Sequence, residues 1–117
     1  TNDLTGYIMA ADRGNKNVSY LYSHYSPAVL RAIRKIITTA RKSGIPVSMC
    51  GEAASDPLLI PLLISFGLEK FSVSPNLIPS TRKEIARWNK KDCDEIADKV
   101  LSLDSESQVI NELKNLK

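Results

Sequence analysis

The sequence predicts an α/β fold in which two short parallel strands are connected by helices. Helical and strand-like hydrophobic patterns alternate along residues 26–88. The segment between the two strand-like runs is long enough for a helix, and a strand–helix–strand connection is right-handed and pairs its strands in parallel. After Trp88 the pattern is helical only. We therefore expect an α/β unit followed by appended C-terminal helices.

The first strongly marked helix is predicted between Ser26 and Gly44. Ser26 can cap it, Pro27 suits its first turn, and Gly44 ends it. Apolar side chains recur between these limits at helical spacing, at Val29, Ile33, Ile36, Ile37 and Ala40. This helix should bury one face.

A short strand is predicted over residues 45–50. Pro46 is tolerated only near its start, and Val47 and Met49 alternate with Ser48 and Cys50. This pattern places the Cys50 thiol at the carboxyl end of the strand.

A second helix should follow from Asp56 and Pro57 toward Gly67, with Pro61 delaying or kinking its first turn. The second strand is predicted over residues 70–74, where apolar side chains alternate with serines before Pro75.

Three further helices complete the prediction. The first is capped by Ser80 or Thr81, with Glu84 placed for a capping box; the second is capped by Asp92, and the third begins at Ser105. We expect residues 1–88 to form one portion of a domain and residues 89–117 to be packing helices of the same domain.

Composition excludes several classes of protein. The 117 residues are 43% hydrophobic and 25% charged, which is typical of one soluble globular domain. The apolar runs are too short for membrane insertion. Two distant cysteines indicate neither a disulfide framework nor a zinc site and favour the cytoplasm. The net charge is +3, but the basic residues are mixed with acidic residues along the chain and are not interleaved with aromatic side chains. We therefore expect no nucleic-acid partner.

Polar groups near the start of the chain suit phosphate chemistry. The carboxylate of Asp3 is a hard ligand for Mg²⁺, and the amide of Asn2 can donate to a phosphate oxygen. Taken alone, this pair also fits helix caps or Asx turns. The guanidinium of Arg13 can bind two oxygens at once, although a surface arginine paired with Asp12 is the alternative.

Cys50 is the sharper candidate, because ligands of α/β folds bind beyond the carboxyl ends of strands. A thiol in reference peptides has a pKa of about 8.5 and can donate a proton near neutral pH. The alternative is a small apolar filler, which Cys93 fits better. Glu52 either orients Cys50 and its loop or is simply exposed. His24 is interpreted as a loop residue, and the tyrosines of the first segment as packing against a part of the protein beyond this chain.

Several short motifs occur along the chain: Thr1-Asn2-Asp3-Leu4-Thr5, Ala11-Asp12-Arg13-Gly14-Asn15, Ser26-Pro27-Ala28-Val29-Leu30, Met49-Cys50-Gly51-Glu52 and Phe71-Ser72-Val73-Ser74. Together they resemble the C-terminal end of enzyme I of the bacterial sugar phosphotransferase system. The resemblance extends to about Trp88. It implies the last two strands, with their helices, of a phosphoenolpyruvate-binding (β/α)8 barrel within a longer protein.

The resemblance also implies a reaction. In that family the phosphoryl group of phosphoenolpyruvate passes to a histidine on a separate domain and then to a histidine-bearing phosphocarrier protein, as the first step of sugar uptake. Asn2 would contact the phosphate, Asp3 would ligate Mg²⁺ at the substrate, Arg13 would bind substrate, and Cys50 would protonate the enolate carbon to release pyruvate. The parent would be a cytoplasmic homo-oligomer, a dimer.

This sequence departs from the family pattern at Gly6, where Gln is usual, and at Ala53 and Ser55, where Met and Gly are commoner. The second magnesium carboxylate, further arginines and the phosphohistidine domain would lie outside this chain, and His24 does not match the phosphorylated histidine. We therefore expect no phosphotransferase activity from the chain alone.

Two alternatives stay open at this stage. Pyruvate phosphate dikinase and phosphoenolpyruvate synthase share the Asn-Asp and Cys-Gly-Glu elements, and a nucleotide-binding region upstream would identify them. A non-catalytic binding or assembly module derived from the barrel is the other alternative.

Overall fold

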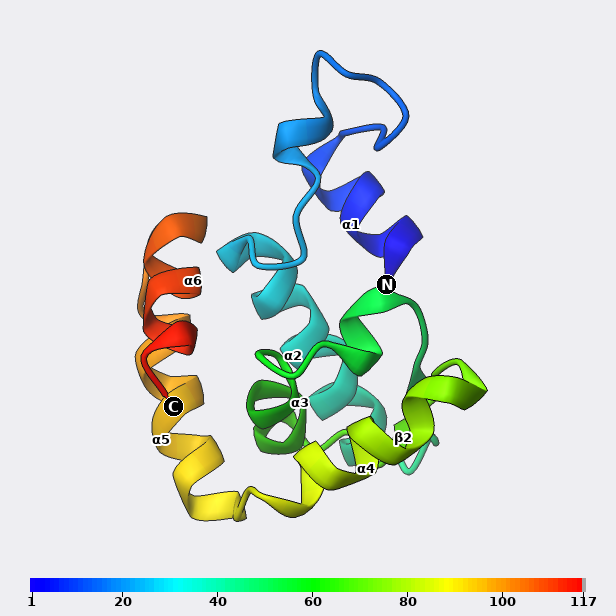
Figure 1. Ribbon diagram of the computed structural model, residues 1–117, viewed down its shortest axis with the longest axis vertical. Coiled ribbons are helices and arrows are strands. Elements are labelled where there is room, and N and C mark those ends of the chain that lie inside the picture. Colours follow the sequence, from blue (N-terminus) through cyan, green and yellow to red (C-terminus); the bar gives the residue numbers. More distant parts are fainter. Residues whose placement is uncertain (117) are drawn as a thin grey trace.

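The computed structural model describes residues 1–116 and is mostly helical (Figure 1). Its helices are α1 (Asn2–Met9), α2 (Pro27–Lys42), α3 (Ile60–Phe66), α4 (Ile78–Ala86), α5 (Lys90–Leu101) and α6 (Glu106–Lys114). Its strands are β1 (Ser48–Met49) and β2 (Lys70–Phe71), and three 3-10 turns are η1 (Ser19–Leu21), η2 (Glu52–Ser55) and η3 (Pro75–Leu77). The described residues extend over 39 × 32 × 28 Å.

The two strands pair in parallel, which confirms the predicted α/β class. Ser48 lies opposite Lys70 and Met49 opposite Phe71, and the Ser72 N–H donates to the Met49 carbonyl oxygen at 2.7 Å. Both strands are shorter than the predicted ranges 45–50 and 70–74. The reason is that each strand has only the other as a partner within residues 1–116, so the flanking extended residues have no ladder to join.

Helix α2 confirms the strongest prediction of the sequence. Val29, Leu30, Ile33 and Ile37 are buried along one face. Ile36, which was predicted on the same stripe, is 47% exposed and lies at the edge of that face. The apolar stripe is thus wider than the surface that the described residues cover.

Helix α3 lies at the centre of the core and packs against α2, α4 and α5. Ile60, Leu62 and Leu63 are almost completely buried. Pro61 occupies the first turn, where a missing N–H costs no helical hydrogen bond, and the helix begins four residues after Asp56. The predicted delay is therefore confirmed.

Two predicted helix starts are wrong. Helix α4 begins at Ile78, before Ser80 and Thr81, so Glu84 lies well inside the helix and cannot form a capping box. Its carboxylate instead binds Arg87 at 2.9 Å and the Trp88 indole N–H at 3.1 Å. Helix α5 is capped by Asn89.

At the start of α5, the side-chain oxygen of Asn89 accepts from the Asp92 N–H at 2.9 Å, which puts Asp92 inside the first turn. The predicted start of α6 at Ser105 is confirmed, with a capping box formed with Gln108. Among the residues described, no helix combines the length and the apolar character that crossing a membrane requires.

Candidate functional site

The start of α1 meets the loop that follows β1. The Thr1 hydroxyl donates to the carbonyl oxygen of Cys50 at 2.9 Å, and the Thr1 nitrogen donates to the same oxygen at 3.1 Å. Figure 1 shows this junction, where the N-terminus lies beside the green segment after β1. The two predicted halves of the site, 49 residues apart in sequence, are therefore adjacent beyond the carboxyl end of β1.

Gly51 permits this close approach. Its φ of +88° lies in the left-handed region that side chains rarely adopt. A Cβ at this position would lie 2.7 Å from the Thr1 hydroxyl oxygen and 3.2 Å from the nearer terminal atom of the Asn2 amide. Both the backbone conformation and the available space thus require glycine here.

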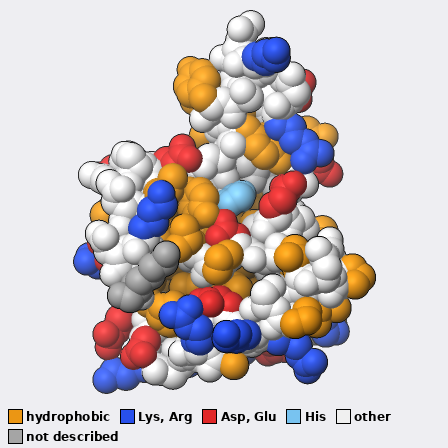
Figure 2. All heavy atoms as spheres, viewed as in Figure 1, with side chains coloured by type: hydrophobic (Ala, Val, Ile, Leu, Met, Phe, Trp, Pro, Cys, Tyr) orange, Lys and Arg blue, Asp and Glu red, His pale blue; other side chains and the backbone are white. Residues whose placement is uncertain are grey.

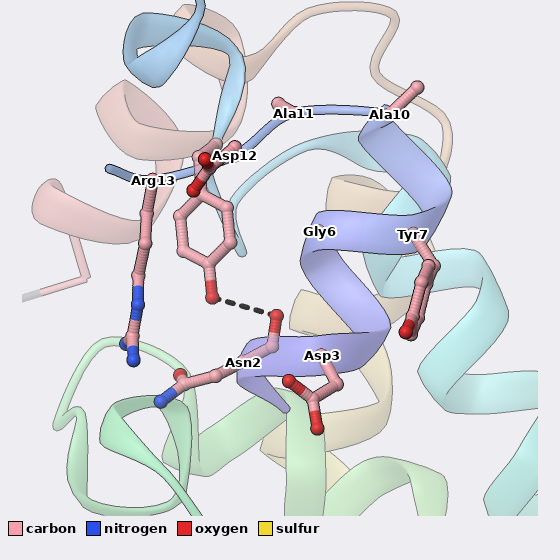
Figure 3. Close-up of a pocket in the computed structure, with 9 residues that line it drawn as sticks. Asn2, Asp3, Gly6, Tyr7, Ala10, Ala11, Asp12 and Arg13 are labelled. Atoms are coloured by element: carbon pink, nitrogen blue, oxygen red, sulfur yellow. Dashed lines mark hydrogen bonds between the residues drawn. The ribbon is translucent and has the colours of Figure 1, made fainter. Parts of the chain in front are cut away.

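An open pocket of about 590 Å³ lies along α1 and the loop that follows it (Figure 3). Its lining residues are Asn2, Asp3, Gly6, Tyr7, Ala10, Ala11, Asp12, Arg13 and Tyr22. In Figure 3 the Arg13 side chain extends along α1 toward the first turn, where Asn2 and Asp3 lie. The structure therefore brings three of the four predicted site residues to one pocket.

The amide of Asn2 lies between a cation and an anion. In the one orientation that satisfies both neighbours, its nitrogen lies 2.7 Å from Oε2 of Glu52 and its oxygen 3.2 Å from Nη1 of Arg13. Glu52 therefore reaches the start of α1 from the loop after Cys50. The sequence had left the role of Glu52 open.

Arg13 is not paired with Asp12, so the alternative of a surface arginine paired with this carboxylate is wrong. Oδ1 of Asp12 accepts from the Gly14 N–H at 2.8 Å, which closes an Asx turn. None of the ion pairs among residues 1–116 joins Asp12 to Arg13. Because Asp12 is bonded within this turn, the Arg13 guanidinium contacts the Asn2 amide instead.

Tyr22 is a site residue that sequence reasoning missed. Its hydroxyl donates to the backbone carbonyl oxygen of Asn2 at 2.7 Å, drawn as the dashed line in Figure 3. We expected the tyrosines to pack outside this chain, and Tyr22 instead holds the first turn of α1. No local pattern in the sequence signals this contact, because it joins residues 20 positions apart.

The Cys50 side chain is exposed but belongs to a neighbouring pocket. That pocket has a volume of about 140 Å³ and is mostly apolar, with Thr1, Ile36 and Met49 among its lining residues. Thr1 lines this pocket and Asn2 lines the larger one. The structure thus brings the Cys50 backbone to α1 without placing its thiol in the pocket of Asn2, Asp3 and Arg13.

Cys93 behaves as the apolar filler that its sequence position predicted. It is completely buried on α5, and burial raises the pKa of its thiol to about 11. This thiol is neutral at physiological pH.

Asp3 fits one part of a magnesium site. Its carboxylate is exposed at the larger pocket, and none of the ion pairs within residues 1–116 involves it. Within the same range no three histidine, cysteine or acidic side chains gather closely enough to hold a metal ion. Mg²⁺ is usually held by one or two carboxylates together with water and substrate oxygens, so Asp3 suits the role of one of its protein ligands.

A second polar cluster surrounds Asp56. Its Oδ2 accepts from the Tyr25 hydroxyl and lies 3.2 Å from Nε2 of His24, and its Oδ1 accepts from the Leu58 N–H at 2.9 Å. Figure 2 shows the single histidine, in pale blue, next to acidic side chains. His24 is a loop residue, as predicted, and it connects the segment before α2 to the segment before α3.

The hydrogen bonds decide the ionisation of this cluster. Burial disfavours the charge of Asp56, but the bonds from His24, Tyr25 and the Leu58 N–H outweigh it and hold the Asp56 pKa below its ordinary value. Burial and the neighbouring carboxylate raise the pKa of Tyr25. Because Asp56 directly follows η2, the cluster fastens the far end of the loop that carries Glu52.

Comparison of the sequence with known protein families assigns the chain to one of them. Residues 1–90 match the family described as PEP-utilising enzyme, PEP-binding domain. The chain belongs to this family, which confirms the resemblance inferred from its motifs.

Similar proteins from several bacteria share the name phosphoenolpyruvate-protein phosphotransferase. The chain is 44% identical to the phosphoenolpyruvate-protein phosphotransferase of Bacillus subtilis (strain 168) over 110 residues, which are 94% of this chain and 19% of that protein. It is 44% identical to that of Priestia megaterium over 115 residues and 39% identical to that of Staphylococcus aureus over 115 residues, each covering 98% of this chain and 20% of the relative. The chain thus spans about a fifth of the length of these relatives.

Proposed function

We propose that this chain supplies part of the phosphoenolpyruvate site of a phosphoenolpyruvate-protein phosphotransferase. The observation that carries the proposal is the convergence of Asn2, Asp3 and Arg13 on one pocket, in a chain of the PEP-binding family. The name that these relatives share favours this activity over that of a dikinase or synthase.

Arg13 and Asn2 would bind the anionic substrate. The Arg13 guanidinium donates from several N–H groups and matches the paired oxygens of a carboxylate or phosphate. Asn2 keeps a second amide N–H after the bond to Glu52, and this N–H is available to a phosphate oxygen. Both side chains therefore orient the phosphoryl group for transfer.

Asp3 would hold Mg²⁺ at the same pocket. The chemistry that this ion supplies when bound is neutralisation of the charge that develops on the substrate oxygens during phosphoryl transfer. Asp3 is exposed and lines this pocket, which supports the assignment.

Cys50 would complete the reaction by proton transfer. Cleavage of the bond between phosphorus and the enol oxygen leaves the enolate of pyruvate, and the thiol proton then forms the new C–H bond at the methylene carbon. In this proposal the Cys50 side chain turns about its Cα–Cβ bond so that its thiol faces the pocket of Asn2. The short distance between the Cys50 backbone and Thr1 supports such a turn.

The phosphoryl acceptor would be a histidine on another part of the protein. His24 is bound to Asp56 and does not line the pocket of Arg13, so it does not suit that role. The histidine-bearing phosphocarrier protein, a cytoplasmic location, a dimeric parent and a place at the first step of sugar uptake belong to the same proposal.

A thiol-specific comparison tests the function. In the full-length protein, Cys50→Ala should slow the formation of pyruvate by at least about tenfold, because it removes the proton donor, while phosphorylation of the acceptor histidine is affected less. Cys93→Ala is the matched control and should leave both steps unchanged. Equal loss of both steps in Cys50→Ala would contradict the assigned role, and pyruvate release by the isolated chain would contradict the expectation that it is inactive alone.

A further inference from the structure

We infer that Glu52 is a positioning residue, which sets the orientation of the Asn2 amide and through it the position of Arg13. The inference rests on the proposed function, because the group that Glu52 orients is the one proposed to bind phosphate. In this inference the group that Glu52 orients is the Asn2 amide and not the Cys50 thiol.

The distances around the amide carry the inference. With its nitrogen 2.7 Å from Oε2 of Glu52 and its oxygen 3.2 Å from Nη1 of Arg13, the Asn2 amide makes a charge-assisted bond on each side. The opposite orientation would set the amide oxygen against the carboxylate and the amide nitrogen against the guanidinium. One orientation of the amide is thus strongly favoured while the Glu52 carboxylate stays in place.

The backbone holds the Glu52 carboxylate in position. On one side, Gly51 lies against Thr1 and Asn2, and both the hydroxyl and the nitrogen of Thr1 bind the carbonyl oxygen of Cys50. On the other side, η2 is followed directly by Asp56, which is held by Tyr25 and His24. Glu52 therefore projects from a short segment that is fastened at both ends.

The arrangement has a consequence for substrate binding. Glu52 uses one N–H of the Asn2 amide and leaves the second for a ligand. The Asn2 oxygen meanwhile accepts from one nitrogen of Arg13, which leaves the remaining guanidinium N–H groups for the anion. Without Glu52 the amide can rotate and present its oxygen, an acceptor, to a phosphate that offers only acceptors.

A double-mutant cycle in the full-length protein tests the inference. Glu52→Met has similar length but no acceptor, and it should lower kcat/KM for phosphoenolpyruvate by roughly 10- to 100-fold, as expected for a lost bond to a charged group. Glu52→Gln keeps an acceptor oxygen and should recover most of this loss. In an Asn2→Ala background, Glu52→Met should cause almost no further loss, because the two residues act as one unit.

The matched control is Glu69→Ala, which removes an exposed carboxylate just before β2, at the other end of the strands, and should leave kcat/KM unchanged. Additive losses in Asn2→Ala and Glu52→Met would overturn the inference, as would a Glu52→Gln protein as impaired as Glu52→Met. If Glu52→Met does not fold, Glu52→Ala takes its place in the same cycle.

A second readout separates this inference from the proposed function. Hydrogen exchange of the Asn2 side-chain amide, followed by NMR, should be slower in the wild type and in Glu52→Gln than in Glu52→Met. Equal exchange rates would overturn the inference even in an active enzyme. A wild-type protein with no phosphoenolpyruvate-dependent transfer, but with a protected Asn2 amide, would overturn the proposed function alone.

Discussion

Gly51 is the residue on which the junction between the two halves of the site depends. It combines a positive φ with a contact so close that any side chain would meet Thr1 or Asn2. The Thr1 hydroxyl cannot move away freely, because it donates to the carbonyl of Cys50. Any substitution of Gly51 therefore has to change either its left-handed backbone conformation or its close contact with Thr1.

Replacing Gly51 with Ala should lower the free energy of unfolding by about 2–4 kcal/mol, because a backbone cost of about 1–2 kcal/mol adds to steric overlap. Gly44→Ala is the matched control. Gly44 also has positive φ, +67°, but a Cβ at this position would meet no atom within 4 Å, so only the backbone cost applies. Urea unfolding of the chain measures both values, and equal losses would show that the contact with Thr1 contributes nothing.

At the scale of elements, the loop segments are held together by side chains that cross from one connection to another. Asp56 illustrates this, since it receives hydrogen bonds from His24 and Tyr25 before α2 and from Leu58 before α3. Arg31 of α2 similarly donates to the carbonyl oxygens of Leu101 and Leu103 at the end of α5, at 3.0 and 3.1 Å. These bonds hold the connecting segments in place relative to one another and to the helix ends.

The Asp56 cluster should make stability depend on pH in the acidic range. Because its pKa is lowered by folding, the charged form of Asp56 favours the folded state. Its stabilisation is fully present above the unfolded pKa of about 3.9 and is lost as the pH falls through the folded value. Asp56→Asn should therefore cost about 1–3 kcal/mol at pH 7, with a smaller difference from the wild type at pH 3.

Urea unfolding at the two pH values measures this effect. Asp98→Asn, which alters an exposed carboxylate on α5, is the control and should behave like the wild type at both pH values. A difference between Asp56→Asn and the wild type that stays constant from pH 7 to pH 3 would contradict the role assigned to the carboxylate.

At the scale of the whole molecule, the described residues leave apolar surface uncovered beside the sheet. Ile36 of α2 is 47% exposed and lines the groove next to β1 together with Leu4 and Val47. Ile45, just before β1, is 59% exposed. The sheet has two strands within residues 1–116, so its outer edges can pair with another chain.

The isolated chain should therefore self-associate, and Ile36→Lys should weaken the association by roughly tenfold or more, as expected from about 1.5–3 kcal/mol for a buried isoleucine. Sedimentation equilibrium over a range of concentrations measures it. Tyr20→Lys, a change of another exposed apolar side chain on η1, is the control and should not alter the dissociation constant. A wild-type chain that stays monomeric at high concentration would contradict this prediction.

Local signals in the sequence predicted the order of the elements well. The spacing of Val29, Ile33 and Ile37, with Ser26 and Gly44 at the ends, was enough to predict α2, and Ser105 was enough to predict the start of α6. The prediction of the start of α5 failed because two residues able to cap a helix lie within a few positions of each other. At α5, Asn89 caps and Asp92 occupies the first turn, and local composition alone does not distinguish these positions.

By itself, the sequence determined the α/β class, the family and the four candidate residues, because periodicity, caps and short motifs are properties of neighbouring residues. Only the tertiary structure decided that Glu52 and Tyr22 hold Asn2, that Arg13 is not paired with Asp12, and that Cys50 lines an adjacent pocket. The physical reason is that these contacts join segments far apart in the chain. Their geometry depends on the path of the backbone through Gly51 and on the packing of α1, which no local pattern encodes.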